Sequence, residues 1–334
     1  MANYKVTDTE LSGIANAIRL KGGTSEPLVF PSGFESAITN IPSGSAVLVS
    51  KTISQNGIYN PVDDNADAFS QVVVNVSGGG GVSDVLRIIC GEISGAISDS
   101  TVSNIAHHAF VSASSLTGVE MNSVKQIGSY AFAFCNNMSY ASFTECESIA
   151  ESCFTSCYSL ENISFPSVIS IGSSCFANCS KLKHVSFPEA TTLASSAFYL
   201  CQMLEDAYLP KVGIIRGGAF YGCKKLSVVN IPNCSIIEYN GFYSCSLNSI
   251  FLPICSNISQ YAFSNCKVLE SVYLLSDTVC VLSNSNAFNT TPIQYSSYLG
   301  YFGSIFVPAS LVEAYKSANA WSMIADRITA YVEA

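Results

Sequence analysis

A phenylalanine recurs at a nearly fixed interval through most of this 334-residue sequence. The interval is 22 residues from Phe110 to Phe242, then 21 residues and finally 25 residues. The nine anchor positions are Phe110, Phe132, Phe154, Phe176, Phe198, Phe220, Phe242, Phe263 and Phe288. A constant period between about 20 and 50 residues is typical of stacked units, each of which buries its apolar face only against its neighbours. The sequence therefore predicts a solenoid.

Each unit also predicts its own local structure. A run such as Val185-Ser-Phe-Pro188 alternates apolar and polar residues and ends in proline, which is typical of a short strand with one buried face. An Ile-Gly pair such as Ile171-Gly172 precedes several anchors, and we interpret its glycine as a corner residue with backbone angles that other residues resist. About eight turns, each adding roughly 4.8 Å, would build a rod or arc about 40 Å long.

The repeated unit carries a family resemblance. Written as a pattern, it reads I-G-x-x-A/C-F-x-x-C-x-x-L-x-x-V-x-F/L-P and resembles the BspA-type leucine-rich repeat of bacterial surface proteins over residues 105–275, with a cap to 334. The resemblance implies a repeat solenoid of mainly β or α+β class, a right-handed leucine-rich-repeat stack of about eight 22-residue turns. It also implies an adhesion or binding protein rather than an enzyme. Two copies depart from the pattern, one at 138–141 and one that lacks a residue before Leu247, and there we expect local irregularity.

Turn, linker and capping signals divide the rest of the chain. Asn56-Gly57 predicts a turn, and Ser310 with Glu313 predicts a capping box for a C-terminal helix. Trp321 and Ile324 are expected to close the open end of the solenoid, because a terminal repeat needs a cap. The predicted domains are a segment of short helices for attachment at 1–45, a small β module at 46–77, a Gly-rich linker at 78–83, the solenoid at 84–300 and the cap at 301–334.

The N-terminal segments carry a second resemblance. The stretches V-T-D-T-E-L-x-x-I-A-N-A-I-R-x-K-G-G-T-S and K-T-I-x-x-N-G-x-Y-N-P-x-D-D-N-A-D-x-F resemble the N-termini of phage and prophage minor structural proteins, over nearly all of residues 4–76. This resemblance implies that residues 1–77 attach to other virion tail proteins while the distal repeats face the host. The predicted function is therefore that of a tail-associated host-binding protein. The alternative is a bacterial cell-surface adhesin that binds a host protein or glycan.

Composition excludes several classes of partner. The net charge is -9, the pI is about 4.8, and no basic patch is present, so we expect no binding to nucleic acid. No apolar run approaches 18 residues and the first residues have no apolar signal core, so we expect neither membrane insertion nor Sec export of this chain. Release by lysis would place a virion protein outside the cell without such a signal. The expected location is a virion tail or a bacterial cell surface.

Most of the 14 cysteines follow the repeat. Twelve occupy equivalent positions in successive repeats, which we call repeat columns, and only Cys90 and Cys280 do not. We interpret the cysteines as small buried hydrophobic residues, because stacked neighbours have parallel side chains that suit the disulfide dihedral poorly.

Metal and catalytic motifs are largely missing. Two close pairs, Cys153 with Cys157 and Cys175 with Cys179, are explained by the repeat columns better than by zinc. The spacing of Asp63, Asn65 and Asp67 matches the first ligands of an EF-hand calcium loop. Ala68 and Val74, however, stand where that loop has glycine and glutamate. No CxxC, HExxH, GxSxG or GxxxxGK[ST] motif occurs. We therefore expect no enzyme activity, no bound metal and no cofactor, and we expect His184 to be a surface residue.

What remains is an aromatic surface. Three successive units carry a tyrosine one position after the anchor, and three later strands carry an outward aromatic residue where earlier strands have serine. The candidate ligand-binding residues are Tyr199, Tyr221 and Tyr243 in the first group and Tyr208, Phe251 and Tyr273 in the second. Exposed aromatic residues in a row are typical of a surface that binds a sugar or a protein hot spot. A ladder that only stabilises the sheet remains the alternative.

Overall fold

The computed structural model describes residues 46–50, 71–75, 94–100, 102–294 and 302–333. The helices predicted within 1–45, the linker at 78–83, the Asn56-Gly57 turn, the calcium-like loop at 63–67 and Cys90 lie outside the described residues. Strands β1 (Ala46–Ser50) and β2 (Gln71–Asn75) pair antiparallel, with Ala46 opposite Asn75. Both strands lie within the segment 46–77, for which a small β module is predicted.

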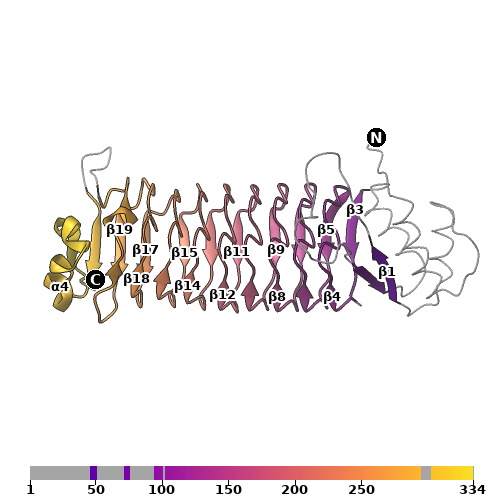
Figure 1. The fold of residues 1–334 in the computed structure, drawn as a ribbon, viewed down its shortest axis with the longest axis horizontal. Coiled ribbons are helices and arrows are strands. Elements are labelled where there is room, and N and C mark those ends of the chain that lie inside the picture. Colours follow the sequence, from indigo (N-terminus) through magenta and orange to yellow (C-terminus); the bar gives the residue numbers. More distant parts are fainter. Residues whose placement is uncertain (1–45, 51–70, 76–93, 101, 295–301, 334) are drawn as a thin grey trace, which may run out of the picture.

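The predicted solenoid is confirmed, and it is a straight rod of about ten turns of about 22 residues (Figure 1). One side of the rod is a single parallel sheet of nine two-residue strands. These strands are β4 (Asn104–Ile105), β6 (Gln126–Ile127), β8 (Ser148–Ile149), β10 (Ser170–Ile171), β12 (Thr192–Leu193), β14 (Ile214–Ile215), β16 (Ile236–Ile237), β18 (Asn257–Ile258) and β20 (Val281–Leu282). The turn count is close to the expected eight.

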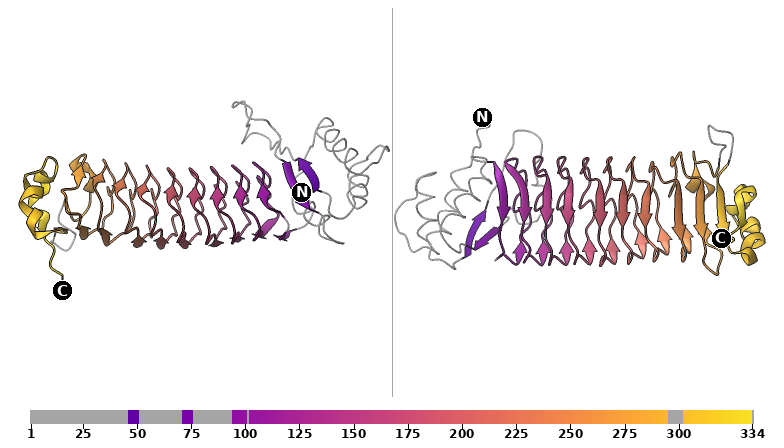
Figure 2. Two further views of the ribbon diagram at one scale, coloured as in Figure 1. Left: turned by 90° about the horizontal axis from the view of Figure 1, so that it is seen from below. Right: turned by 180° about the vertical axis from the view of Figure 1, so that it is seen from behind.

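The opposite side consists of three shorter parallel sheets that follow one another along the rod (Figure 2). The first has four strands, β3 (Gly95–Ser98), β5 (Leu116–Glu120), β7 (Tyr140–Ser142) and β9 (Asn162–Ser164). The second has three, β11 (His184–Ser186), β13 (Asp206–Tyr208) and β15 (Val228–Asn230). The third has four, β17 (Ser249–Leu252), β19 (Ser271–Leu274), β21 (Ser304–Val307) and β22 (Ile328–Ala330).

Two interruptions separate these three sheets. Among the described strands, β9 does not pair with β11 and β15 does not pair with β17. The second interruption falls where one unit is a residue short, as expected. The irregularity expected near Tyr140 is wrong, because β7 pairs in register with both of its neighbours. The interruption between β9 and β11 was not predicted, because the repeats there have the regular length of 22 residues.

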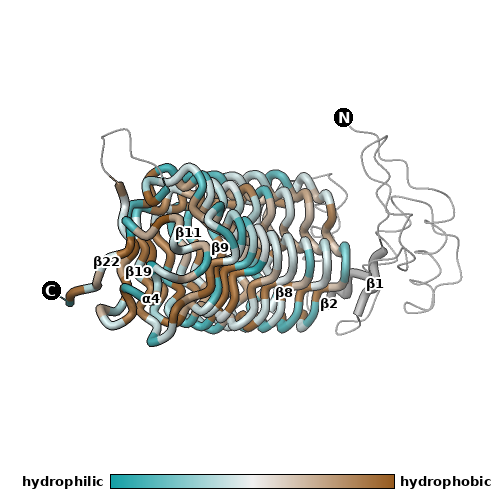
Figure 3. The backbone as a smooth tube through the Cα atoms, turned by 60° about the vertical axis from the view of Figure 1, so that its left-hand side comes forward, coloured by the Kyte–Doolittle hydropathy of each residue, from teal (hydrophilic) through white to brown (hydrophobic). Residues whose placement is uncertain are grey.

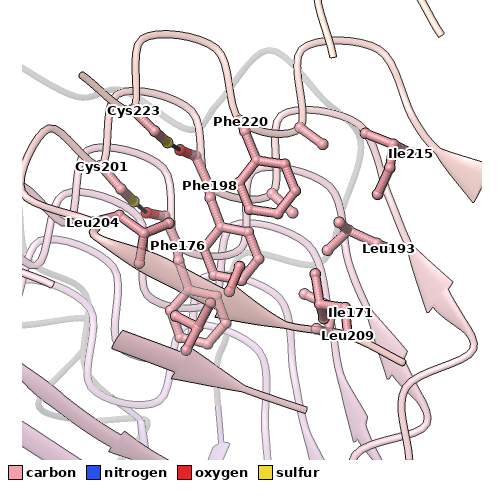
Figure 4. Close-up of a cluster of buried hydrophobic side chains, with 14 of the residues drawn as sticks. Ile171, Phe176, Leu193, Phe198, Cys201, Leu204, Leu209, Ile215, Phe220 and Cys223 are labelled. Carbon is pink, nitrogen blue, oxygen red and sulfur yellow. Dashed lines mark hydrogen bonds between the residues drawn. The ribbon is translucent and has the colours of Figure 1, made fainter. Parts of the chain in front are cut away.

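The anchoring phenylalanines form a continuous stack inside the rod (Figure 4). Successive ring centroids lie 4.9 to 5.6 Å apart, and neighbouring rings are parallel to within 10°. Each ring is at most 2% exposed. Apolar residues recur at the same places in successive turns (Figure 3), so burial of one turn depends on the next. Burying a phenylalanine contributes about 1.5–3 kcal/mol, and each stacked pair adds about 0.5–1.5 kcal/mol.

The glycine of the Ile-Gly pair has a different role from the one expected. Neither Gly128 nor Gly172 has a positive φ. A Cβ on Gly172 would lie 2.5 Å from the backbone carbon of Ala150 in the preceding turn. Glycine is present there because two backbones approach closely, not because the chain turns left-handed.

The left-handed corners lie two residues before and two residues after the anchor. In the turn of Phe176 they are Ser174, with φ 53°, and Asn178, with φ 62°. Such residues cost about 1–2 kcal/mol relative to glycine. Hydrogen bonds between turns offset this cost: the Asn178 N–H, for example, donates to the Tyr199 carbonyl at 2.7 Å. Only Gly218 and Gly222 are glycines with positive φ among the described residues.

All 13 described cysteines are free thiols, and all are buried as expected. Seven of the nine anchors have a cysteine three residues later, and its thiol donates to the carbonyl of the preceding anchor at 3.0 to 3.2 Å. Figure 4 shows two of these contacts, from Cys201 to Phe176 and from Cys223 to Phe198. Burial raises the pKa of Cys201 to about 12. Cysteine therefore serves here as a small apolar residue that also satisfies a carbonyl of the preceding turn.

The C-terminal cap contains η3 (Ala309–Leu311), α4 (Val312–Ser317), η4 (Trp321–Arg327) and β22. Trp321 and Ile324 are buried, as expected, and the Trp321 ring lies 6.0 Å from the ring of Phe288, the last anchor. The predicted capping box is wrong: α4 has Leu311 as its N-cap, and no side chain caps it. The end of the rod is closed by packing of these apolar side chains.

Candidate recognition surface

Tyr199, Tyr221 and Tyr243 lie together in what we call the tyrosine column. Their ring centroids are 5.0 Å and 4.7 Å apart, and the rings are parallel to within 17°. Each tyrosine is half-buried and follows a buried anchor, and its carbonyl accepts a hydrogen bond from the preceding turn, which fixes the stacking register. The sequence-based expectation that these three side chains are contiguous is met.

Stacking limits what the tyrosine column can bind. Both faces of the Tyr221 ring are covered by its neighbours, so the ring presents an edge and a hydroxyl group to solvent. Burial, followed by the nearby phenols of Tyr243 and Tyr199, raises the pKa of Tyr221, so its hydroxyl stays a hydrogen-bond donor. The middle of the column can donate or accept hydrogen bonds, but it offers no free ring face on which a sugar could stack.

A second aromatic ladder runs along the outward face of the last sheet, and we call it the aromatic strip. It consists of Phe251 on β17, Tyr273 on β19, Phe306 on β21 and Tyr331, which directly follows β22. Tyr273 lies 6.3 Å from Phe251, 4.7 Å from Phe306 and 5.9 Å from Tyr331, measured between ring centroids. Phe251 is 50% exposed. The strip therefore crosses the whole C-terminal sheet.

Two members of this strip were missed by the sequence analysis. Phe306 alternates with Ile305 and Val307 in the run 304–308, and this alternation would have placed it outward beside Tyr273. Tyr331 gave no signal, because its strand has no repeat pattern and its placement depends on the fold of the cap.

Tyr208 does not join either group. Its ladder neighbours are Ser186 and Asn230, and the interruption after β15 separates it from Phe251. Its side chain is nonetheless 45% exposed. The six predicted residues thus lie in three places: a stack of three, a pair inside a longer strip, and one isolated ring.

The aromatic strip has an uncharged border. Ser249, Ser271 and Ser304 lie opposite one another in the strand register, two residues before the aromatic position and on the same face. The described ion pairs that join successive turns all lie in earlier turns, from Lys125–Glu145 to Arg216–Glu238. Neutral hydroxyl groups beside aromatic rings suit an uncharged ligand better than an ionic one.

The cysteine pairs considered for zinc are unsuited to it. Cys153, Cys157, Cys175 and Cys179 are completely buried, and burial raises their pKa well above the ordinary value, which keeps them protonated. The described residues contain no group of three or more potential metal ligands. His184 lies on the surface, where its Nδ1 is 2.5 Å from a carboxylate oxygen of Asp206 in the next turn. None of the described helices is long and apolar enough to cross a membrane.

The sequence matches a family model described as a BspA type leucine rich repeat region (6 copies), over residues 89–205 and 191–305. Together the matches span more than half of the chain. Among solved structures, the chain is similar to a leucine-rich-repeat protein of T. pallidum, with 29% identity and a TM-score of 0.40 over 41% of this chain and 69% of that one.

Two further solved structures share the similarity at lower identity. A leucine-rich-repeat protein from Bacteroides ovatus is 16% identical, with a TM-score of 0.48 over 78% of this chain and 69% of that one. A leucine rich cell surface protein from Faecalibacterium prausnitzii is 19% identical, with a TM-score of 0.44 over 79% and 72% of the two chains. No curated protein matches the sequence.

Proposed function

This chain belongs to the BspA-type leucine-rich-repeat family, and from that premise we propose that it is a non-enzymatic recognition protein whose aromatic strip binds a protein or glycan on a cell surface. The observation that carries the proposal is the aromatic strip on the outward face of the last sheet, in which Phe251 is exposed and the other three rings are half-buried. Earlier strands carry Ser142, Ser164 and Ser186 at the same ladder position, so a stable turn does not need an aromatic ring there. Aromatic residues that stability does not require are candidates for contact with a ligand.

The position of the strip fits this role. It lies at the end of the rod that carries the cap, whereas β3, the first strand of the solenoid, lies at the opposite end (Figure 1). A protein attached through its N-terminal residues would present the strip away from the attachment point. The proposed partners are therefore a cell-surface protein or glycan at the strip and, through residues 1–77, other proteins of a virion tail.

The geometry of the strip distinguishes the two ligand classes. The Tyr273 ring is contacted by three other rings, whereas Phe251 has a stacking partner only on the side of Tyr273. A sugar that stacks on a ring face would therefore depend mainly on Phe251. A protein partner would contact ring edges along the whole strip, and its binding energy would be spread over several rings.

Binding of the full chain to intact anaerobic gut-type bacteria, to a glycan array and to animal matrix proteins tests the function. We expect saturable binding to bacterial cells, as a host-recognition protein requires. Binding only to animal glycans or matrix proteins would favour the surface adhesin instead. Saturable binding to none of the three would contradict recognition by this chain.

Two single variants identify the ligand class. For a glycan, Phe251→Ser alone should weaken binding by at least 10-fold, while Tyr331→Ser should change it by less than about threefold. For a protein, both variants should weaken binding by comparable factors.

The resemblance of residues 4–76 to phage structural proteins supports the virion location over the cell surface. Immunogold electron microscopy with an antibody against the solenoid tests it directly. Label on tails released by lysis is the expected result. Label on the envelope of intact cells would support the adhesin and contradict attachment to a tail.

A further inference from the structure

Cys280 is the residue on which the cap is anchored. Its backbone N–H donates to the hydroxyl oxygen of Tyr315 at 2.9 Å, and its carbonyl accepts from the indole Nε1 of Trp321 at 2.7 Å. Both aromatic side chains are almost completely buried. Two side chains of the cap thus satisfy backbone groups of this last turn that no further turn is present to bind.

The thiol of Cys280 is directed at another thiol. Its Sγ lies 3.9 Å from the Sγ of Cys255 in the preceding turn and 3.7 Å from the carbonyl oxygen of Val281, and its one S–H can donate to either acceptor. Cys234, the neighbour of Cys255 on the other side, donates instead to the carbonyl of Ile236. Among the described cysteines, Cys255 and Cys280 are therefore a distinct pair, because the hydrogen bonds that the other thiols donate go to backbone oxygens.

The register explains why this pair differs from the stacked cysteines. Asn257 lies opposite Val281, so Cys280 is opposite Ser256 and one residue out of register with Cys255. Neither residue lies within a strand, since β18 begins at Asn257 and β20 begins at Val281, and both side chains are buried. A staggered pair avoids the parallel side chains of an in-register pair, which suit the disulfide dihedral poorly.

We propose that Cys255 and Cys280 form a disulfide that fastens the last turn of the solenoid, to which the cap is hydrogen-bonded, to the preceding turn when the protein meets a low-molecular-weight disulfide such as oxidised glutathione. The thiolate of Cys255 attacks one sulfur of glutathione disulfide and releases one glutathione thiolate. Cys280, after losing its proton, then attacks the Cys255 sulfur of the mixed disulfide and releases the second glutathione. Two protein thiols are oxidised, one glutathione disulfide is reduced to two thiols, and the two protons pass to the leaving thiolates.

The local electrostatics favour this order of attack. The hydrogen bond from Cys280 lowers the pKa of Cys255, while the same contact and then burial raise the pKa of Cys280. Cys255 is thus the thiol that ionises first. Both residues are fully buried, so the reagent reaches them only when α4 and η4 open locally, and the reaction is expected to be slow.

The test uses the full chain incubated with oxidised glutathione, followed by alkylation of the remaining thiols and tandem mass spectrometry. We expect a peptide in which Cys255 is joined to Cys280, formed faster than any other cross-link. A dominant Cys234–Cys255 cross-link would overturn the proposal. Stable glutathione adducts without an internal cross-link would overturn it as well.

A second measurement follows the effect on the cap. Hydrogen exchange of the α4 amides should slow by roughly 100-fold on oxidation, because the bond holds in place the turn to which Tyr315 and Trp321 of the cap are hydrogen-bonded. Cys280→Ser should abolish this change, and Cys234→Ser, a buried thiol in the same column as Cys255, should leave it intact. If hydrogen exchange slows equally on oxidation of Cys280→Ser, the disulfide is contradicted. If Cys280→Ser fails to fold, tandem mass spectrometry of the oxidised natural chain decides the question.

Discussion

The phenylalanine stack inside the rod and the aromatic strip outside it are both ladders of rings from successive turns, but they differ in regularity and in extent. Inside, parallel rings 4.9 to 5.6 Å apart run through all nine anchors. Outside, a continuous row of rings occupies only the last described sheet, whereas earlier strands carry Ser142, Ser164, Ser186, the isolated Tyr208 and Asn230 at the same ladder position. The difference indicates that an internal ring is required in every turn for burial, whereas an external ring is optional for stability. Aromatic rings that stability does not require, such as those of the aromatic strip, are available to contact a ligand.

Removal of an internal ring should have the largest effect. Phe198→Ala leaves a cavity between two stacked rings, and it should lower the free energy of unfolding by about 3–5 kcal/mol. Urea unfolding measures the change. Phe251→Ala, which truncates an exposed ring of the same kind, is the matched control and should cost less than about 1 kcal/mol. Equal losses in the two variants would remove the distinction between the ladders.

Alkaline pH should weaken the interior next. Burial raises the pKa of Cys201 from an ordinary value of 9.0 to about 12, so the folded thiol stays protonated while the unfolded thiol ionises above pH 9. Its contribution is complete below pH 9 and is lost as the pH rises toward 12. The stability difference between the natural chain and Cys201→Ala should therefore fall by about 1.4 kcal/mol between pH 8 and pH 10. A difference that does not vary with pH would contradict a buried, protonated thiol.

Close packing of backbones predicts a further difference between two glycines. Gly172→Ala would place a Cβ against the backbone of the preceding turn and should cost about 1–3 kcal/mol. Gly213→Ala meets nothing nearer than the Asn233 carbonyl oxygen at 3.9 Å and should change stability by less than about 0.5 kcal/mol. Thermal unfolding of both variants measures the contrast. Comparable losses would show that these glycines are needed for flexibility instead.

Much of this architecture could be predicted from the sequence, because a 22-residue period repeats the same burial pattern in every turn. The period alone predicts that the anchors from Phe110 to Phe288 stack on one another. It also predicts the stacking of the cysteines and of the tyrosine column. The role of Gly172 could not be predicted, since the approach of two backbones depends on how the turns pack. The packing of Tyr331 could not be predicted either, because the cap does not follow the repeat. The contact between Cys255 and Cys280 could not be predicted because Cys280 does not occupy a repeat position.

The external ladder should contribute least to stability. Replacing Phe251, Tyr273 and Phe306 by serine restores the residue type of earlier turns, and each change should cost about 0.5 kcal/mol through lost cross-strand contacts. The solenoid should therefore still fold, with its circular dichroism spectrum unchanged. A variant that unfolds at room temperature would show that the strip only stabilises the sheet.

The central claim is tested most directly by comparing binding of two triple variants to intact bacterial cells. One variant carries Phe251→Ser, Tyr273→Ser and Phe306→Ser. The other carries alanine at Tyr199, Tyr221 and Tyr243. Alanine suits these positions because Ala133 and Ala177 occupy the same position after the anchor in earlier turns. Recognition through the aromatic strip predicts at least a 10-fold loss of affinity in the first variant and less than a threefold change in the second. Unchanged binding by a folded strip variant, or loss confined to the tyrosine variant, would contradict it.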